Sequence, residues 1–147
     1  MSPTAAQLLQ PENLSLEIAA TDKDTAILEV AAIMQNSPDL SDFKRFCQEL
    51  LIRDQLRSTA AGYGVAFPHA RTDAVREIVI AAGRSTPGIL FGEERVHFIF
   101  VIGTPREKAA DYLIAVGTLA RRMRIEKTRT ALRKAATPGE FMQILNR

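Results

Sequence analysis

The stretch "VHFIFVI", residues Val96–Ile102, is apolar at every position except His97. A run of Val, Ile and Phe of this length is typical of a β-strand, and because it is apolar almost throughout, both of its faces need cover. Val75–Ala82 is a second run of this kind, and a glycine follows each of them. We therefore predict two buried strands in a sheet covered by helices on both faces, an α/β fold.

Two further segments have the pattern of short strands. Apolar residues alternate with polar ones along Leu14–Ala19, and Gly64–Phe67 is a short run beside turn residues. Apolar residues at helical spacing predict the remaining elements, which are a helix from Thr21 that stops at Pro38, one from about Ser41 to Arg57, and helices at Glu107–Met123, Glu126–Ala135 and from Thr137 onward.

Capping signals and apolar stripes give these helices predicted starts and buried faces. Thr21 with Asp24 is predicted to cap the first helix, and Thr137, Pro138 and Glu140 form the start signal of the last. The stripes predicted to face the core are Ile27, Val30, Ala31 and Met34; Phe43, Phe46, Cys47, Leu50 and Leu51; Leu113, Val116, Ala120 and Met123; and Phe141, Ile144 and Leu145.

The composition fits a globular protein of one domain. The chain has 147 residues, of which 46% are hydrophobic and 24% charged, so we expect one domain over residues 1–147 with a tail of about ten residues at its start. The longest apolar runs are far shorter than the roughly 20 residues that cross a bilayer, and the N-terminus lacks a signal pattern. We therefore expect a cytoplasmic protein without membrane insertion, in which the single Cys47 is a core residue.

Charge is unevenly distributed although the net charge is only +2. Residues 119–134 carry seven basic side chains and one acidic side chain, Glu126. This pattern is typical of a solvated helix face, and an acidic protein partner is the alternative. Nucleic acid binding is not expected, because no aromatic residues lie among the basic ones. Two histidines and one cysteine without metal-ligand spacing predict no metal site, and nothing points to a cofactor.

A second stretch, "STAAGYGVAFPHA" at Ser58–Ala70, points to function. Pro68 fixes its own backbone angle and favours an extended conformation in the residue before it, so His69 is presented on a stiff segment. The segment also holds glycines and hydroxyl groups that are able to surround an oxyanion with hydrogen bonds, namely Ser58, Thr59, Gly62 and Gly64. These four residues are therefore predicted to bind phosphate.

An imidazole with a reference pKa near 6.5 is largely neutral at pH 7 and is then a nucleophile. Beside anion-binding groups it suits phosphoryl transfer, which depends on positioning and charge stabilisation. Arg53, Arg57 and Arg71 are all candidates to supply positive charge, and the residues alone do not rank them. A structural role for His69 remains the alternative, and a structural role is predicted for His97, which lies in an apolar strand.

Three stretches of the chain resemble the fructose/mannitol type of EIIA domain of the phosphotransferase system, including its nitrogen-regulatory paralogues. They are "LLQPENLSLEIAATDKDTAILEVA" at 8–31, "LLIRDQLRSTAAGYGVAFPHA" at 50–70 and "TPREKAADYLIAVGTLARRM" at 104–123. The strongest match is Arg53 followed by an acid, the Ser58-Thr59 pair, Gly62-x-Gly64 and Pro68-His69. The resemblance covers nearly the whole chain.

The resemblance implies a three-layer α/β/α sandwich around a mixed sheet, and it implies a phosphocarrier. His69 would accept a phosphoryl group on Nε2 from phospho-HPr and either pass it to the cysteine of an EIIB partner or act as a signalling state. Arg53 corresponds to the arginine that the family keeps beside its phosphohistidine. The competing interpretation is a regulatory protein that docks on a transporter or kinase with little or no onward transfer.

The sequence departs from the family pattern at two places. Ala60 and Ala61 stand where relatives usually have glycine after the threonine. Tyr112-Leu113 stands where many relatives have a His-Leu pair that supplies a second active-site histidine. Tyrosine donates a hydrogen bond but cannot carry an imidazolium charge. We therefore expect Tyr112 to lie in the site and to alter the rate or the pH dependence of transfer.

Overall fold

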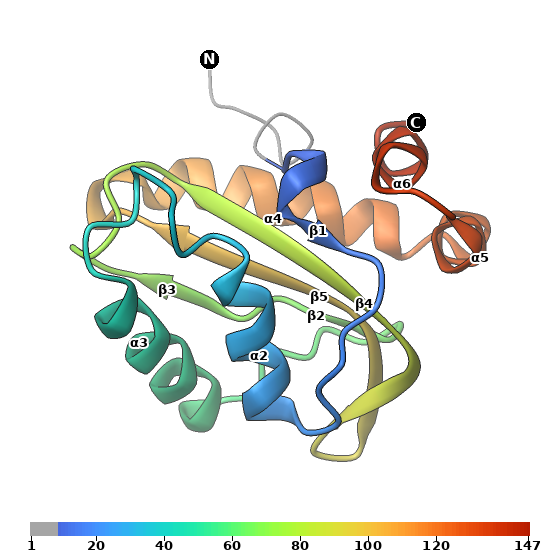
Figure 1. Ribbon diagram of the computed structural model, residues 1–147, viewed down its shortest axis with the longest axis horizontal. Helices are drawn as coiled ribbons and strands as arrows, with labels where there is room; N and C mark the ends of the chain where they lie inside the picture. Colours follow the sequence, from blue (N-terminus) through green and yellow to red (C-terminus); the bar gives the residue numbers. More distant parts are fainter. Residues whose placement is uncertain (1–8) are drawn as a thin grey trace.

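The apolar stretch 96–102 lies within the central strand of a five-stranded sheet (Figure 1). The computed structural model describes residues 9–147. Its strands are β1 (Leu14–Ser15), β2 (Val65–Ala66), β3 (His69–Arg71), β4 (Val79–Phe91) and β5 (Glu94–Thr104). They are arranged in the order β1-β4-β5-β2, and β3 also pairs with β5. Because β4 and β5 are antiparallel and the other pairs are parallel, the sheet is mixed, as the resemblance implied.

Both faces of β5 are buried, which confirms the prediction from its unbroken apolar run. Phe98, Phe100 and Ile102 belong to the core cluster on one face of the sheet. Ile99 and Val101, which alternate with them, belong to the cluster on the other face. This period of two is what a strand buried between two layers requires.

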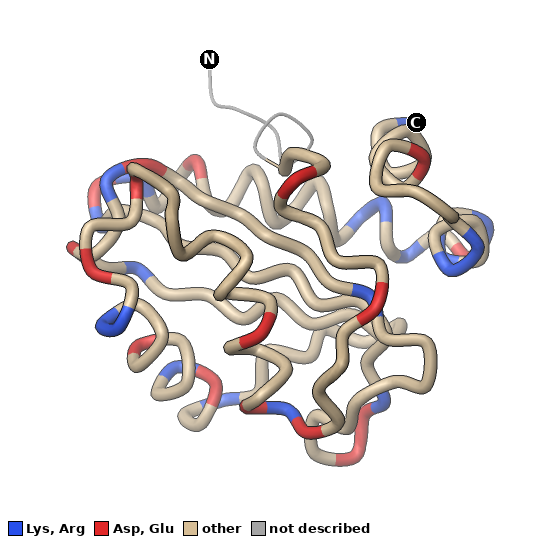
Figure 2. The backbone as a smooth tube through the Cα atoms, in the orientation of Figure 1, with Lys and Arg blue, Asp and Glu red and all other residues tan. Residues whose placement is uncertain are grey.

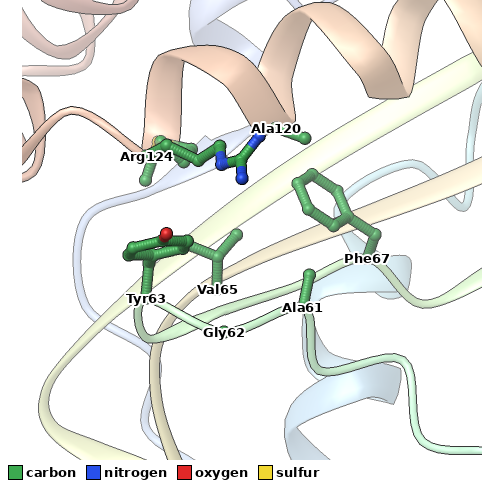
Figure 3. A pocket seen from close by; sticks show the side chains of 8 residues that line it. Ala61, Gly62, Tyr63, Val65, Phe67, Ala120 and Arg124 are labelled. Atoms are coloured by element: carbon green, nitrogen blue, oxygen red, sulfur yellow. The ribbon is translucent and has the colours of Figure 1, made fainter.

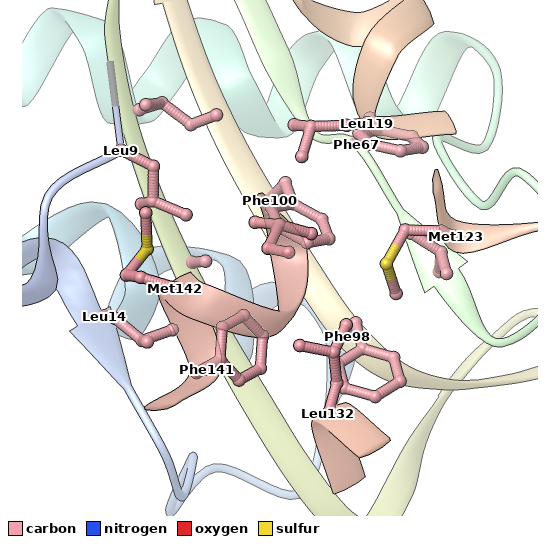
Figure 4. Packing of buried hydrophobic residues seen from close by; sticks show 14 of the residues in the cluster. Leu9, Leu14, Phe67, Phe98, Phe100, Leu119, Met123, Leu132, Phe141 and Met142 are labelled. Carbon is pink, nitrogen blue, oxygen red and sulfur yellow. The ribbon is translucent and has the colours of Figure 1, made fainter. Parts of the chain in front are cut away.

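Helices cover the two faces of the sheet (Figure 1). One layer contains α2 (Lys23–Ala32) and α3 (Phe43–Leu56). The other contains α4 (Ala109–Met123), α5 (Glu126–Lys134) and α6 (Pro138–Leu145), whose apolar side chains surround the phenylalanines of β5 (Figure 4). Two short 3-10 helices, η1 (Pro11–Asn13) and η2 (Arg106–Lys108), precede β1 and α4. The fold is therefore a three-layer α/β/α sandwich.

The predicted helix signals hold for the last helix and need two corrections in the first, because α2 ends at Ala32, before the predicted stop at Pro38, and because its cap differs. Thr137 caps α6, and its hydroxyl oxygen accepts a bond from the Glu140 N–H at 3.1 Å. The cap of α2 is Asp22 rather than Thr21, because the Asp22 carboxylate accepts from the Thr25 N–H at 3.0 Å. A carboxylate at this position also interacts favourably with the helix dipole.

The predicted strands differ from the observed ones in length. β1 is confined to Leu14–Ser15, shorter than the predicted Leu14–Ala19, and beyond it the Ile18 N–H bonds the Arg84 carbonyl of β4 at 2.8 Å. β4 begins at Val79 and continues to Phe91, beyond the predicted end at Ala82. Its second half contains proline and glycine, and a register shift between Arg84 and Ile89 accommodates them while β5 supplies the pairing.

Two other predictions can be compared with the structure. The predicted N-terminal tail falls mostly on residues 1–8, which lie outside the described part, but Leu9 is already buried in the core. The basic residues of 119–134 gather on the C-terminal end of α4 and on α5 (Figure 2). Cys47 is half-buried beside the α2–α3 cluster, and burial raises the pKa of its thiol, as expected of a packing residue.

Candidate functional site

His69 is the first residue of β3, where Pro68 delivers it to the edge of β5. The Ile102 N–H donates to the Pro68 carbonyl at 2.9 Å, and His69 lies opposite Ile102 in the parallel pair. The His69 side chain is half-buried, and its Nδ1 lies 2.9 Å from the Phe67 carbonyl oxygen. Since a carbonyl oxygen only accepts, Nδ1 carries the proton. In the neutral ring, Nε2 is then the nitrogen with the free lone pair.

The surroundings of His69 favour its neutral form. Burial lowers the pKa of His69 below its usual value of 6.5, and the positive charge of Arg53 lowers it further. These two effects outweigh the bond to the Phe67 carbonyl, which acts in the opposite direction. The His69 ring is therefore neutral at pH 7.

Arg53 lies in the last turn of α3 and lines the same pocket as His69. This hollow of about 290 Å³, here called the His69 pocket, is lined by Glu49, Ile52, Arg53, Leu56, His69, Ala70 and Arg71. The Arg53 Nη1 donates to the Arg57 carbonyl at 2.8 Å, which holds the guanidinium at the end of the helix. Arg71 also lines the pocket, whereas Arg57 does not. Of the three arginines that the sequence left unranked, Arg53 and Arg71 are therefore the ones placed to supply positive charge beside His69.

Tyr112 faces His69 from α4. The two ring centroids are 5.0 Å apart, with an angle of 46° between the planes. Burial raises the pKa of Tyr112 to about 12, against the opposing charge of Arg53. The hydroxyl group therefore keeps its proton and remains a hydrogen-bond donor at neutral pH.

The position of Tyr112 corrects the predicted buried face of α4. Leu113, predicted to point inward, is 67% exposed, and Tyr112 instead packs against the core cluster. The inward stripe runs through Tyr112, Ala115, Leu119 and Met123. Of the predicted stripe, Met123 is buried and Val116 and Ala120 pack against the core cluster as expected, so the error is confined to Leu113 at its start.

Asp54, the acid that follows Arg53 in the family motif, lies beside the site, and the sequence predicted no role for it. Its side chain is buried in α3 and accepts two bonds from Thr59, from the N–H at 3.1 Å and from the hydroxyl at 2.7 Å. Lys23 of α2 forms an ion pair with its other oxygen at 2.7 Å. Asp54 thus ties α2, α3 and the segment before β2 together. The available signal was its place four residues after Leu50, on the buried stripe of α3.

The charge of Asp54 is retained despite its burial. Burial acts to raise the pKa of Asp54, but the hydrogen bonds from Lys23 and Thr59 outweigh it and hold that pKa below its usual range. The bond to Asp54 occupies the hydroxyl proton of Thr59, so this hydroxyl has no proton left to donate to a phosphate. Ser58 is exposed, and its oxygen accepts from the Ala60 N–H at 3.2 Å. Of the two predicted hydroxyl donors, only Ser58 keeps its proton available.

Gly62 and Gly64 lie away from His69, in contrast to their predicted role. Both have positive φ, +84° and +74°, in the turn that leads into β2. The Gly64 carbonyl accepts from the His97 N–H at 2.8 Å, near the other end of β5 from His69. Val65 pairs with Phe98 and His69 with Ile102, a separation of four residues, or about 13 Å along a strand. The glycines build the turn and do not line the His69 pocket.

His97 makes a structural contact, as predicted. Its Nδ1 lies 3.0 Å from the Ser85 carbonyl across the β4–β5 hairpin. Residues 9–147 contain no group of three His, Cys, Asp or Glu side chains that would hold a metal ion. Over the same range, every helix is too short or too polar to cross a membrane.

The low pKa of His69 gives a first prediction. We expect the His69 ring to titrate below pH 6.5 in NMR spectra, and Arg53→Gln to move the midpoint upward because a nearby positive charge is removed. Arg57→Gln serves as a matched control, since Arg57 is exposed and does not line the pocket. A native midpoint at or above 6.5, or equal shifts in both variants, would contradict this electrostatic assignment.

Comparison with known proteins assigns the family. A sequence profile described as "Phosphoenolpyruvate-dependent sugar phosphotransferase system, EIIA 2" matches residues 7–147. The chain is 27% identical over 143 residues to the PTS system fructose-specific EIIABC component of Bacillus subtilis, which covers 95% of this chain and 22% of that protein. It is 30% identical over 141 residues to a nitrogen regulatory protein of Bradyrhizobium diazoefficiens, which covers 94% of this chain and 92% of that one.

Solved structures agree with this assignment at the level of the fold. The nitrogen regulatory protein IIA-Ntr of Neisseria meningitidis superposes with a TM-score of 0.87 at 23% identity, over 95% of this chain and 97% of that one. The Escherichia coli complex of enzyme IIA for mannitol with phosphorylated enzyme IIB gives a TM-score of 0.81 at 20% identity, over 95% and 99%. With the family profile matching almost every residue and the same three-layer architecture present, the chain belongs to the EIIA type 2 family of the phosphoenolpyruvate-dependent sugar phosphotransferase system.

Proposed function

We propose that the chain is a cytoplasmic phosphocarrier that accepts a phosphoryl group on Nε2 of His69 from phospho-HPr. The observation that carries this proposal is the bond between Nδ1 and the Phe67 carbonyl, which places the proton on Nδ1 and leaves the lone pair on Nε2. Arg53, in the same pocket, supplies positive charge for the phosphoryl oxygens.

The transfer exchanges one nitrogen–phosphorus bond for another. The Nε2 lone pair attacks phosphorus, the bond to the donor imidazole breaks, and the donor nitrogen keeps its electron pair. Nδ1 of His69 keeps its proton, which is hydrogen-bonded to the Phe67 carbonyl, so the phosphorylated ring carries a positive charge. A cationic ring is a better leaving group, which suits a carrier that passes the group on.

Exposed apolar side chains around the His69 pocket support docking of protein partners there. Ile52 and Leu56 line the pocket and are 56% and 80% exposed. Large apolar side chains that are exposed together on a surface mark sites of protein–protein contact. The solved complex of a related IIA with a phosphorylated IIB supports an EIIB domain as the acceptor.

The competing fate of the phosphoryl group is a regulatory one. The similarity to a nitrogen regulatory protein over most of both chains favours a signalling role, in which phosphorylation changes the charge of the docking surface. The two roles share the first step and differ in whether an EIIB cysteine takes the phosphoryl group from His69.

Intact-mass measurement tests the shared first step. The chain is incubated with phosphoenolpyruvate, enzyme I and HPr, and we expect it to gain one acid-labile phosphoryl group. Without HPr, we expect no gain in mass. An EIIB domain added afterwards separates the two fates, because onward transfer returns the chain to its original mass. An unmodified chain, under conditions that label a known EIIA, would overturn the phosphocarrier proposal and leave docking alone.

Tyr112 provides a further prediction about the rate. We expect Tyr112→Phe to slow phosphorylation about tenfold, since one hydrogen bond to a phosphoryl oxygen is worth roughly 1.4 kcal/mol. Tyr112→His should be slowed less than Tyr112→Phe, because an imidazole at this position still donates one hydrogen bond. Single-turnover phosphorylation by phospho-HPr measures both variants. Equal rates for the native chain and both variants would remove Tyr112 from the mechanism.

A further inference from the structure

A second hollow lies between the turn at residues 61–64 and the C-terminal end of α4, apart from the His69 pocket (Figure 3). It has a volume of about 200 Å³ and is here called the Tyr63 pocket. Its lining residues are Ala61, Gly62, Tyr63, Val65, Phe67, Ala120, Met123 and Arg124. The two pockets share no lining residue.

The inner wall of the Tyr63 pocket is apolar. Val65, Phe67 and Met123 belong to the buried core cluster, and Ala120 packs against it. The Tyr63 ring stands opposite α4 and is 52% exposed (Figure 3). An apolar cavity of about 150 Å³ is large enough to bind benzene. The Tyr63 pocket therefore has room for one aromatic ring with a small substituent.

The rim of the pocket is positively charged. The exposed Arg124 guanidinium extends across the opening (Figure 3), and within residues 9–147 it has no ion pair. Arg129 lies over the Tyr63 ring at 5.0 Å from its centroid and donates to the Met123 carbonyl at 2.6 Å. Among the described residues that line the pocket, none is a carboxylate. A ligand with a negative charge would thus meet uncompensated positive charge.

The conformation of Tyr63 also sets this pocket apart. Its φ of +58° lies in the left-handed region, which a residue with a side chain adopts at a cost. Core packing does not offset that cost, because about half of the ring is exposed. The turn nevertheless places an aromatic ring at the edge of an apolar hollow, as a stacking surface for a ligand requires.

We propose that the Tyr63 pocket binds small aromatic carboxylates. The aromatic ring of the ligand would lie between Tyr63 and the apolar wall at Phe67 and Met123, and its carboxylate would pair with Arg124. Arg124 is well suited to this role because a guanidinium binds a carboxylate through two parallel hydrogen bonds.

The ligand would also touch a residue that controls His69. The Phe67 side chain lines the Tyr63 pocket, while the Phe67 carbonyl accepts the bond from Nδ1 of His69 at 2.9 Å. Occupancy of the pocket therefore bears on the residue that orients the imidazole ring. An effect on phosphorylation rests on the proposed function, whereas binding itself does not.

NMR titration of the ¹⁵N-labelled chain with benzoate tests the site. We expect saturable shifts of the Gly62 and Gly64 amides, and about tenfold weaker binding by Arg124→Gln, because glutamine is able to keep one of the two hydrogen bonds to the carboxylate but loses the other. Arg121→Gln, on the same helix but outside the pocket, should bind as the native chain does. Benzyl alcohol, a neutral molecule of similar size, should bind the native chain about tenfold more weakly than benzoate.

The outcomes separate a built site from a general attraction to basic residues. Shifts spread over the arginines of α4 and α5, equal losses in the two variants, or no saturation would overturn the proposal. The His69 ring resonances give the second readout: benzoate should move them in the native chain and not in Arg124→Gln at the same concentration. Saturable binding that leaves the His69 ring unmoved would overturn the link to His69, whether or not His69 is phosphorylated.

Discussion

Replacing His69 by glutamine is expected to abolish phosphorylation of the chain by phospho-HPr. The amide nitrogen of glutamine takes the place of Nε2 but has no nucleophilic lone pair. The change therefore removes the chemistry while keeping a polar side chain of similar length. Intact-mass measurement after incubation with phosphoenolpyruvate, enzyme I and HPr should show only the unmodified variant.

His97→Gln is the matched control for this experiment. His97 is the second of the two histidines in the chain, and it bonds the Ser85 carbonyl in the β4–β5 hairpin. We expect this variant to gain one phosphoryl group as fast as the native chain does. A phosphoryl group on the His69 variant, or its loss from the His97 variant with the fold intact, would move the acceptor away from His69.

Replacing Asp54 by alanine is expected to lower the free energy of unfolding by about 3 kcal/mol, because it leaves two donors of Thr59 unsatisfied and removes a buried ion-pair partner. Lys23 is 29% exposed and regains water, which keeps the loss below that of a fully buried pair. Urea unfolding measures the change. A double-mutant cycle with Lys23→Ala separates the ion pair from the Thr59 bonds.

The stability lost in Asp54→Ala should also depend on pH. Because the pKa of Asp54 is held below its unfolded value of 3.8, its charge stabilises the fold above that pH. The stabilisation is lost as the pH falls through the lower folded pKa. The difference in stability between the native chain and Asp54→Ala should therefore be constant near neutrality and shrink in acid. A loss under about 1 kcal/mol at pH 7 would contradict the tying role of Asp54.

The fold was predictable to the extent that it follows from apolar pattern. The unbroken run 96–102 indicated a strand covered on both sides, and Thr137 indicated the start of α6, as observed. The extent of β4 was not predictable, because its second half contains Pro87 and Gly88 and is held by pairing with β5. Tertiary pairing here overrides local propensity.

The candidate site was predictable where residues are neighbours in sequence and uncertain where they are not. Pro68 presents His69 on a stiff extended segment as expected, though at the start of β3 rather than at a strand end, and the glycines of the same motif lie four or more residues away along β5. The spacing of the motif does not show that β2 and β3 share one edge of β5. The acid after Arg53 belongs to the motif, but the buried role of Asp54 was not predictable, because charged residues are usually exposed and its partners come from α2 and from Thr59.

The most direct test of the central claim is the nitrogen to which phosphorus is attached. Selective ¹⁵N labelling of histidine in the phosphorylated chain, followed by NMR of the phosphorus–nitrogen coupling, assigns it. We predict phosphorus on Nε2 of His69 and a proton retained on Nδ1 by the Phe67 carbonyl. Phosphorus on Nδ1, or on any residue other than His69, would contradict the account.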